Sequence, residues 1–284
     1  MRAGSAVALV LALALLASCN APDTVAKFCS SAVATLKTGD ALFDDMKASC
    51  IREARTFEPV GTFAVSDSSP AACDNVGKQA EGVKAASKIL SNYFIALNDL
   101  ASFGTSKAGD DAKDLLTKAS TEAKLGAAPQ KALSSVAGFL TRAAMSGYQQ
   151  KLLADDVVKV HEDVKTVLDG LGEAVGVVYL QQLRDEELKT AARYKEFRLV
   201  AEQQHQWTAD ATLVLDSRWQ ADRATFAAKQ KAALSYQAAL ETLARGNEDL
   251  AAHARSFKAI ELAGLLGPYV AQLDSLVPAI QKAF

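Results

Sequence analysis

The sequence contains few residues that break helices and no excess of either charge. Six of its 284 residues are prolines and 7% are aromatic, whereas alanine, leucine, lysine and glutamate are abundant. This composition is typical of long helices. Lysine and arginine number 31 against 33 aspartates and glutamates, so the clustered basic excess that nucleic-acid binding requires is missing. We therefore expect a helical protein with no nucleic-acid partner.

The sequence also lacks the motifs of common catalytic and metal sites. It has three histidines, His161, His205 and His253, and none has a ligand-spaced neighbour. The segment HEDVK at 161–165 has the first half of a zinc-protease motif, but Lys165 stands where the second imidazole is needed. No nucleophile elbow, phosphate-binding loop or dinucleotide fingerprint occurs. We expect no catalytic residues, no metal and no cofactor.

Paired aspartates are the remaining candidates for acid–base chemistry. They occur at 44–45, 110–111 and 155–156. Adjacent residues of a helix point about 100° apart, so the two carboxylates of a pair do not converge on one proton. The sequence therefore predicts no shared-proton site.

The N-terminus has an apolar run that ends at a cysteine. Residues 6–17 are only alanine, valine and leucine, a run too short to span a bilayer and typical of a secretory leader. The run ends in Leu16-Ala17-Ser18-Cys19, which resembles a bacterial lipobox in all four positions. The resemblance implies that residues 1–18 are a signal peptide and that Cys19 becomes a lipidated N-terminus.

The lipobox resemblance carries further expectations about location. Acyl chains such as palmitate on Cys19 give stable attachment to a membrane, which is then a partner of the protein. Asn20 at the next position points to the outer membrane rather than to inner-membrane retention. We expect the mature chain to face the periplasm. Exposure on the outer face of the same membrane is the alternative.

Three cysteines remain after Cys19, and the periplasm favours one disulfide among them. Cys29 and Cys50 lie on one predicted helix, where 21 residues rise about 31 Å, far beyond disulfide reach. Cys50 near a helix end and Cys73 after the following loop are the favoured pair, which leaves Cys29 as a small buried residue. A bond between Cys29 and Cys73, or no bond, are the alternatives.

Apolar periodicity predicts an all-α fold, an elongated helical bundle with long, partly coiled-coil-like helices. One domain spans 19–284, with an irregular loop at 56–74. The expected helices are about 23–55, 75–103, 110–124, one opened by Pro129, one from Leu153, one capped by Asp210 and ended by Gly246-Asn247, and 248–284 with a break or kink at Gly267-Pro268.

Two seams are the clearest signals of helix packing. One repeats every seven residues at Val76, Val83, Leu90 and Leu97. The other alternates steps of three and four, at Leu153, Val157, Val160, Val164, Val167, Leu171, Val175 and Val178. Three glycines at 170, 172 and 176 lie within the second seam and mark a bend or a close approach of helices.

Two segments share the pattern Tyr-x-x-Ala-Leu-x-x-Leu-Ala. They are YFIALNDLA at 93–101 and YQAALETLA at 236–244. One interpretation is a duplicated interaction face that presents the hydroxyls of Tyr93 and Tyr236. The other is convergence, because helices rich in alanine and leucine generate this spacing easily.

The leading functional hypothesis is a lipid-anchored helical binding or scaffold protein of the cell envelope. Its partner is expected to be another envelope protein or peptidoglycan, docked on a long helical face. Asp222 and Lys229 interrupt an apolar seam, as on a surface only partly buried within the protein. The alternatives are a membrane-active protein that inserts residues 259–270, an envelope enzyme, or a carrier of a small ligand.

Overall fold

The computed structural model describes residues 21–56, 70–101, 106, 108–144, 150–204, 208–254 and 259–284 of the chain. Every regular element in these ranges is a helix, which confirms the predicted all-α class. The leader, Cys19, Asn20, His205 and most of the predicted loop at 56–74 lie outside the described residues.

The elements follow one another along the chain without any strand in the described ranges. They are α2 (Ala21–Arg55), α3 (Ala71–Ala101), α4 (Ala112–Glu122), α5 (Ala127–Ala143), α6 (Gln150–Glu173), the π-helix η2 (Ala174–Tyr179), α7 (Leu180–Gln203), α8 (Ala209–His253) and α9 (Ala259–Gln281).

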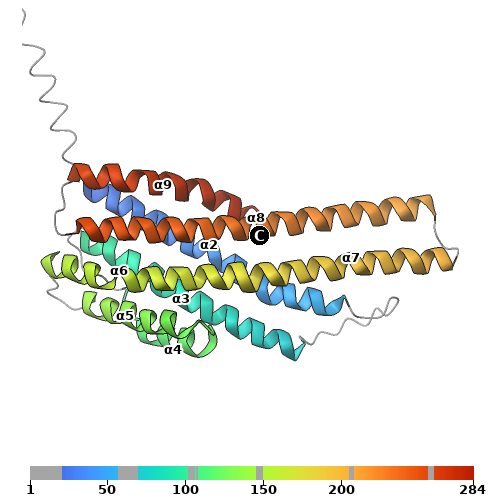
Figure 1. The fold of residues 1–284 in the computed structure, drawn as a ribbon, viewed down its shortest axis with the longest axis horizontal. Helices are drawn as coiled ribbons and strands as arrows, with labels where there is room; N and C mark the ends of the chain where they lie inside the picture. The colour runs from blue at the N-terminus through green and yellow to red at the C-terminus, as the bar shows by residue number, and fades with distance from the viewer. Residues whose placement is uncertain are drawn as a thin grey trace, which may run out of the picture.

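The long helices lie side by side along one axis, and the short α4 and α5 cover one side (Figure 1). α2 packs mainly against α3 and α9, and α8 packs mainly against α9 and α6. The ends of α7 and α8 that face each other extend beyond the other helices as a pair. We call residues 190–204 and 208–222 the α7–α8 hairpin. The predicted elongated bundle is therefore confirmed.

Both predicted seams form the core. In α3 the side chains of Val83, Leu90 and Leu97 are buried, and Val76 is half-buried at the end of the row. In α6 and η2 the buried members are Val157, Val160, Val164, Val167, Leu171 and Val175. The side chain of Leu153 lies outside the described residues.

Gly176 of the second seam marks a close approach to α8, which agrees with one of the sequence interpretations, whereas a Cβ added to Gly172 would meet nothing within 4 Å. A Cβ added to Gly176 would lie 2.1 Å from the side-chain nitrogen of Gln237 on α8. The Gln237 Nε2 donates a hydrogen bond of 3.0 Å to the carbonyl oxygen of Gly172. The chain forms the π-helix η2 here, and such wide turns free backbone groups for outside partners.

Several predicted helix boundaries are wrong. α3 begins at Ala71, within the stretch 56–74 that the sequence assigns to a loop. The N-cap of α8 is Thr208, whose hydroxyl accepts a hydrogen bond of 3.2 Å from the backbone N–H of Ala211. Asp210, the predicted cap, lies instead in the first turn, where its charge favours the helix dipole.

The helices also continue through two predicted breaks. α8 does not end at Gly246-Asn247 but runs on to His253. Gly246 lets Phe28 of α2 pack on the helix, because an added Cβ would lie 2.5 Å from that ring. α9 contains both Pro268 and Pro278 and is not interrupted at Gly267-Pro268.

The apolar segment 259–270 forms the first half of α9. Leu266, Leu273 and Ile280 on this helix are buried in the core. Among the described residues, no helix combines the length and the apolar content needed to cross a membrane.

A disulfide joins Cys50 near the end of α2 to Cys73 near the start of α3, with a Cα–Cα distance of 5.6 Å. The predicted pairing is therefore confirmed. Cys29 is a free, fully buried thiol. Its burial raises the pKa of the thiol to about 12, so the side chain behaves as a small apolar group.

Removal of the disulfide should destabilise the protein through the unfolded state. The double variant Cys50→Ala, Cys73→Ala releases a closed loop with a sequence separation of 23, so we expect unfolding to become easier by about 3 kcal/mol. Thermal unfolding in the presence and absence of dithiothreitol measures the effect. The reductant should lower the Tm of the wild type and leave that of the double variant unchanged. Equal responses of the two proteins would contradict a disulfide contribution.

Candidate functional site

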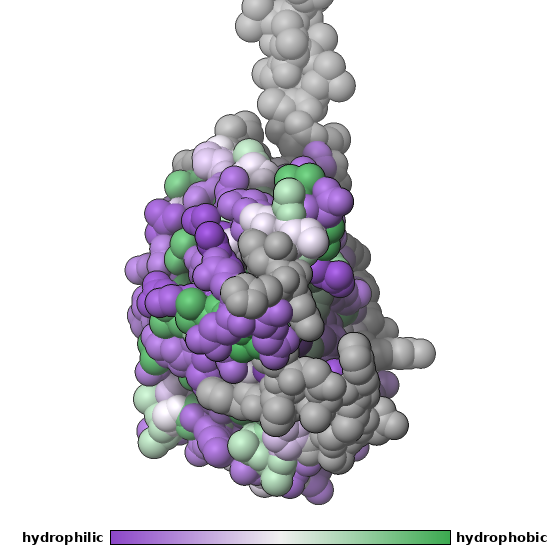
Figure 2. All heavy atoms as spheres, turned by 90° about the vertical axis from the view of Figure 1, so that its right-hand side faces the viewer, coloured by the Kyte–Doolittle hydropathy of each residue, from purple (hydrophilic) through white to green (hydrophobic). Residues whose placement is uncertain are grey.

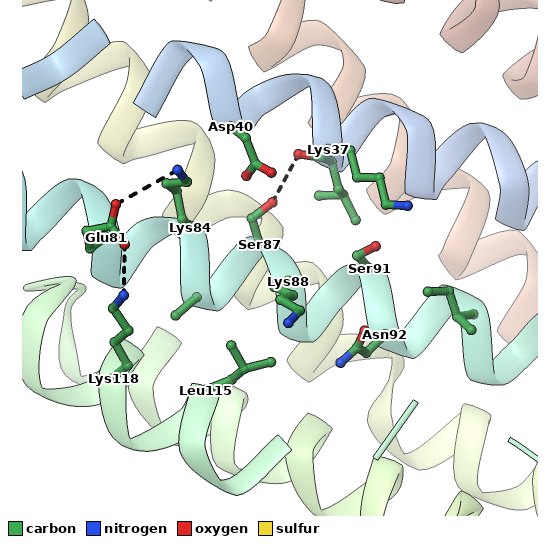
Figure 3. Close-up of a pocket in the computed structure, with 13 residues that line it drawn as sticks. Lys37, Asp40, Glu81, Lys84, Ser87, Lys88, Ser91, Asn92, Leu115 and Lys118 are labelled. Atoms are coloured by element: carbon green, nitrogen blue, oxygen red, sulfur yellow. Dashed lines mark hydrogen bonds and ion pairs between the residues drawn. The ribbon is translucent and has the colours of Figure 1, made fainter. Parts of the chain in front are cut away.

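A groove of about 630 Å³ runs between α2, α3 and α4. Figure 3 shows α3 along its centre, with α2 on one side and α4 on the other. We call it the α2–α4 groove. Its charged lining residues are Lys37, Asp40, Glu81, Lys84, Lys88 and Lys118.

Ion pairs across the rim hold most of these lysines. Lys84 of α3 reaches Asp44 of α2 at 2.8 Å and Glu81 at 3.8 Å. Lys118 of α4 binds the same Glu81 at 2.8 Å. The hydrogen bond from Lys118 lowers the pKa of Glu81. These pairs are partly exposed, so each stabilises the fold by about 1 kcal/mol or less, but together they link three helices over the groove.

Asp40 points into the α2–α4 groove from α2 (Figure 3). No ion pair is formed by this half-buried carboxylate with any described residue. Burial raises the pKa of Asp40; Lys84 and Lys37 oppose this shift, and Asp44 and Glu81 add to it. A carboxyl group in this state gains from a cationic or hydrogen-bond-donating ligand that replaces the lost water.

The groove suits the binding of a ligand with both charges better than catalysis. Ser87 on its floor donates a weak hydrogen bond of 3.3 Å to the carbonyl oxygen of Leu36. Neither of the histidines that the structure describes lines the groove to act as a base for this hydroxyl. In the part of the chain that the structure describes, no three residues of the metal-ligating types gather into a site.

A second polar centre is buried where α2, η2 and α8 meet. The carboxylate of Asp45 accepts hydrogen bonds from Arg52 at 3.0 and 3.2 Å, from Lys229 at 2.7 Å and from Tyr179 at 2.7 Å. Phe284 covers it, with the Lys229 nitrogen 5.9 Å from the ring centroid. The Asp45 side chain is only 10% exposed, so its charge depends on these donors.

Glu186 of α7 completes this centre, which we call the ionic cluster (Asp45, Ser49, Arg52, Tyr179, Glu186 and Lys229). Its carboxylate accepts from the hydroxyl of Ser49 at 2.6 Å and from Arg52 at 3.1 Å. Arg52 therefore binds two carboxylates from different helices at once. The cluster ties the last turns of α2 to the start of α7 and to the middle of α8.

The ionic cluster has a defined effect on acid stability. Burial alone would raise the pKa of Asp45, but hydrogen bonds from Arg52, Lys229 and Tyr179 outweigh it, and the pKa lies below its ordinary 3.8. A carboxyl group with a lowered pKa in the folded state stabilises the fold above pH 3.8. That stability is lost as the pH falls through the folded-state pKa.

Lys229 and Asp222 are both partly buried, as the sequence interpretation of a partly buried surface states. Each has a partner within the protein, because Lys229 binds Asp45 at 2.7 Å and Asp222 accepts a hydrogen bond of 2.7 Å from the Tyr194 hydroxyl. The ionic cluster was not predicted from the sequence. The one signal for it was Lys229, a lysine within an apolar seam. The expected divergence of adjacent aspartates is confirmed, since Asp44 and Asp45 bind different partners.

The interaction face expected at Tyr93 and Tyr236 is wrong, because both side chains are fully buried. The Tyr93 hydroxyl donates to the side-chain oxygen of Asn247 on α8 at 2.9 Å. The Tyr236 ring lies against Gly39 of α2, where an added Cβ would be 2.4 Å away. The repeated pattern places two tyrosines in the core rather than on a surface.

The two histidines that the structure describes, His161 and His253, take no part in either centre. His161 is partly exposed, and its ring nitrogen lies 2.7 Å from the carbonyl oxygen of Val158 in the preceding turn. His253 lies in the last turn of α8.

No known protein family, curated protein or solved structure matches this chain.

Removal of the Asp45 carboxylate, the acceptor that Arg52, Lys229 and Tyr179 share, should destabilise the fold. Asp45→Ala leaves the buried donors of Lys229 and Tyr179 without their partner, so we expect the free energy of unfolding to fall by about 3–5 kcal/mol at pH 7. Urea denaturation measures it. The difference from the wild type should narrow as the pH falls below 3.8, the ordinary pKa of the group.

The neighbouring residue provides a matched control. Asp44 is 63% exposed and pairs with Lys84, so Asp44→Ala should lower the free energy of unfolding by less than about 1 kcal/mol. Similar losses in the two variants would contradict a special role for the ionic cluster.

Proposed function

We propose that this chain is a lipid-anchored helical binding or scaffold protein of the bacterial outer membrane, facing the periplasm. The lipobox Leu16-Ala17-Ser18-Cys19 supports the anchor. The observation that carries the scaffold role is the placement of the α7–α8 hairpin, which lies at the end of the bundle opposite to the start of α2 (Figure 1).

Because of this placement, a membrane anchor at Cys19 would separate the hairpin from the membrane by the length of the bundle. Ala21, the first residue of α2, comes directly after Asn20 and the proposed acylated Cys19. α8 runs from the hairpin back to the end where α2 begins, and its 45 residues rise about 68 Å. Acyl chains on Cys19 would therefore hold the hairpin far from the membrane surface, where a periplasmic partner can reach it.

The hairpin offers contacts suited to such a partner. Leu199, Leu213 and Val214 are exposed, Leu213 by 71%. Figure 2 views the molecule from the hairpin end and shows small hydrophobic patches among mainly hydrophilic residues. A mixed surface of this kind remains soluble when free and still contributes apolar area to an interface. The proposed partner is an envelope protein or peptidoglycan.

The anchor is tested at the N-terminus of the protein isolated from its native cells. Mass spectrometry should find a chain that starts at Cys19 and carries acyl chains, and Cys19→Ser should abolish the acylation. A chain that retains residues 1–18, or an unmodified residue 19, would remove the basis of the anchor. Dye release from phospholipid vesicles by the Cys19→Ser protein would instead favour a membrane-active protein.

The scaffold role is tested with a photoreactive amino acid placed at Leu213 in living cells. Leu234 is the matched control, because it is a leucine of the same helix and is 57% exposed but lies in the body of the bundle. Crosslinks to one envelope component should form at position 213 and be several-fold weaker at position 234. Equal crosslinking at both positions, or none at 213, would contradict docking through the hairpin.

A further inference from the structure

A pocket of about 400 Å³ lies at the base of the α7–α8 hairpin, where α2 ends. We call it the arginine pocket; its lining includes Arg55 of α2, Arg193, Tyr194 and Phe197 of α7, and Leu215 and Arg218 of α8. It is separate from the α2–α4 groove, with which it shares no lining residue.

The side chains that line this pocket carry more positive than negative charge. Four arginines and one aspartate, Asp222, line it. Arg52 is already neutralised within the ionic cluster, and Asp222 accepts a hydrogen bond from Tyr194. Arg55 and Arg218 are exposed at the rim, and neither forms an ion pair with a carboxylate of any described residue. Arg55 of α2 and Arg218 of α8 thus line one pocket without a carboxylate partner among the described residues.

The rest of the pocket is largely apolar. Phe197 and Leu215 present hydrocarbon surface, and the guanidinium of Arg193 lies 5.3 Å from the centroid of the Phe197 ring. The Tyr194 ring packs against Trp219 at 5.4 Å between centroids. This contact and the hydrogen bond from Tyr194 to Asp222 connect α7 to α8 and fix the walls of the pocket.

We propose that the arginine pocket binds a small amphiphilic oxyanion, in which one carboxylate or phosphate group is joined to an apolar body. Guanidinium groups match the geometry of carboxylate and phosphate oxygens and can bind them through two parallel hydrogen bonds. A pocket of this volume with apolar walls and a few charged groups is typical of small-molecule sites. The oxyanion lies between Arg55 and Arg218, and the apolar body lies on Phe197 and Leu215.

This site goes beyond the proposed scaffold role and does not depend on the anchor. Lysines of the α2–α4 groove are less suited to such a ligand, because Lys84, Lys88 and Lys118 are already held by acids of this chain. Arg55 and Arg218 have no such partner among the described residues to lose when a ligand binds.

Equilibrium dialysis with octanoate tests the proposal on the full-length chain carrying Cys19→Ser, which removes the acyl chains that would compete with the probe. Octanoate should bind with saturation at one site. Acetate has the oxyanion alone and octan-1-ol has the apolar body alone, so each should bind at least about tenfold more weakly. Acetate binding as tightly as octanoate, or the absence of saturation up to about 10 mM octanoate, would overturn the proposal.

Two variants locate the site, and a third is the matched control. Arg55→Gln and Arg218→Gln should each weaken octanoate binding by about tenfold, because each removes a charged hydrogen bond. Arg198→Gln should leave it unchanged, because Arg198 lies on the same helix outside the pocket and pairs with Glu202 at 3.0 Å. Equal weakening in all three variants would show only a loss of general positive charge and would refute the pocket.

The source of the ligand is decided by a second arm of the experiment. Vesicles of phosphatidylglycerol and phosphatidylcholine are compared with vesicles of phosphatidylcholine alone. Binding to the anionic vesicles that is lost in Arg55→Gln and Arg218→Gln, but not in Arg198→Gln, identifies an anionic lipid. Saturable octanoate binding without vesicle binding identifies a free small molecule. Both results support the same site when octanoate binds with saturation, whereas vesicle binding without octanoate binding, or binding of neither probe, overturns the proposal.

Discussion

The fold depends on the ionic cluster in which Asp45 and Glu186 share Arg52. Apolar seams hold helices together, but they allow one helix to slide along another by whole turns with little change in contact. A buried carboxylate allows no such slide, because it loses its hydrogen bonds and remains a buried charge. We interpret the cluster as the contact that fixes the axial positions of α2, α7 and α8, with the Cys50–Cys73 disulfide fixing α3 to the same end of α2.

The two candidate ligand sites depend on this register in different ways. The α2–α4 groove is closed by rim pairs that link α2, α3 and α4, so its lysines serve the fold and its Asp40 remains for a ligand. The arginine pocket lies beyond the cluster and is lined by both Arg52 and Arg55. One turn of α2 separates Arg52, which binds two carboxylates, from Arg55, which binds no carboxylate of the described residues.

Much of the bundle could be predicted from local pattern. The seams through Val83 and Val164 follow from helical periodicity, and the Cys50–Cys73 pair follows from the rise of a helix. The end of α8 could not be predicted, because Asn247 is buried in the packed bundle and accepts a hydrogen bond from Tyr93, a residue 154 positions away. The two sites were missed for the same reason: each combines charged residues from separate helices, and only packing shows which charges neutralise each other.

The π-helix η2 links α6 to α7, and its backbone geometry decides which face of α7 turns toward the core. Upstream, the buried seam advances in alternating steps from Val157 to Leu171; across η2 it advances by four each time, through Val175, Tyr179 and Leu183. A wide turn absorbs one extra residue in this way. Deleting that residue would restore an ordinary helix and leave the residues after it on the faces that they occupy now. Deleting a residue elsewhere in α7, where no wide turn absorbs the change, would instead rotate all later residues of the helix by about 100° and take the α7–α8 hairpin with them.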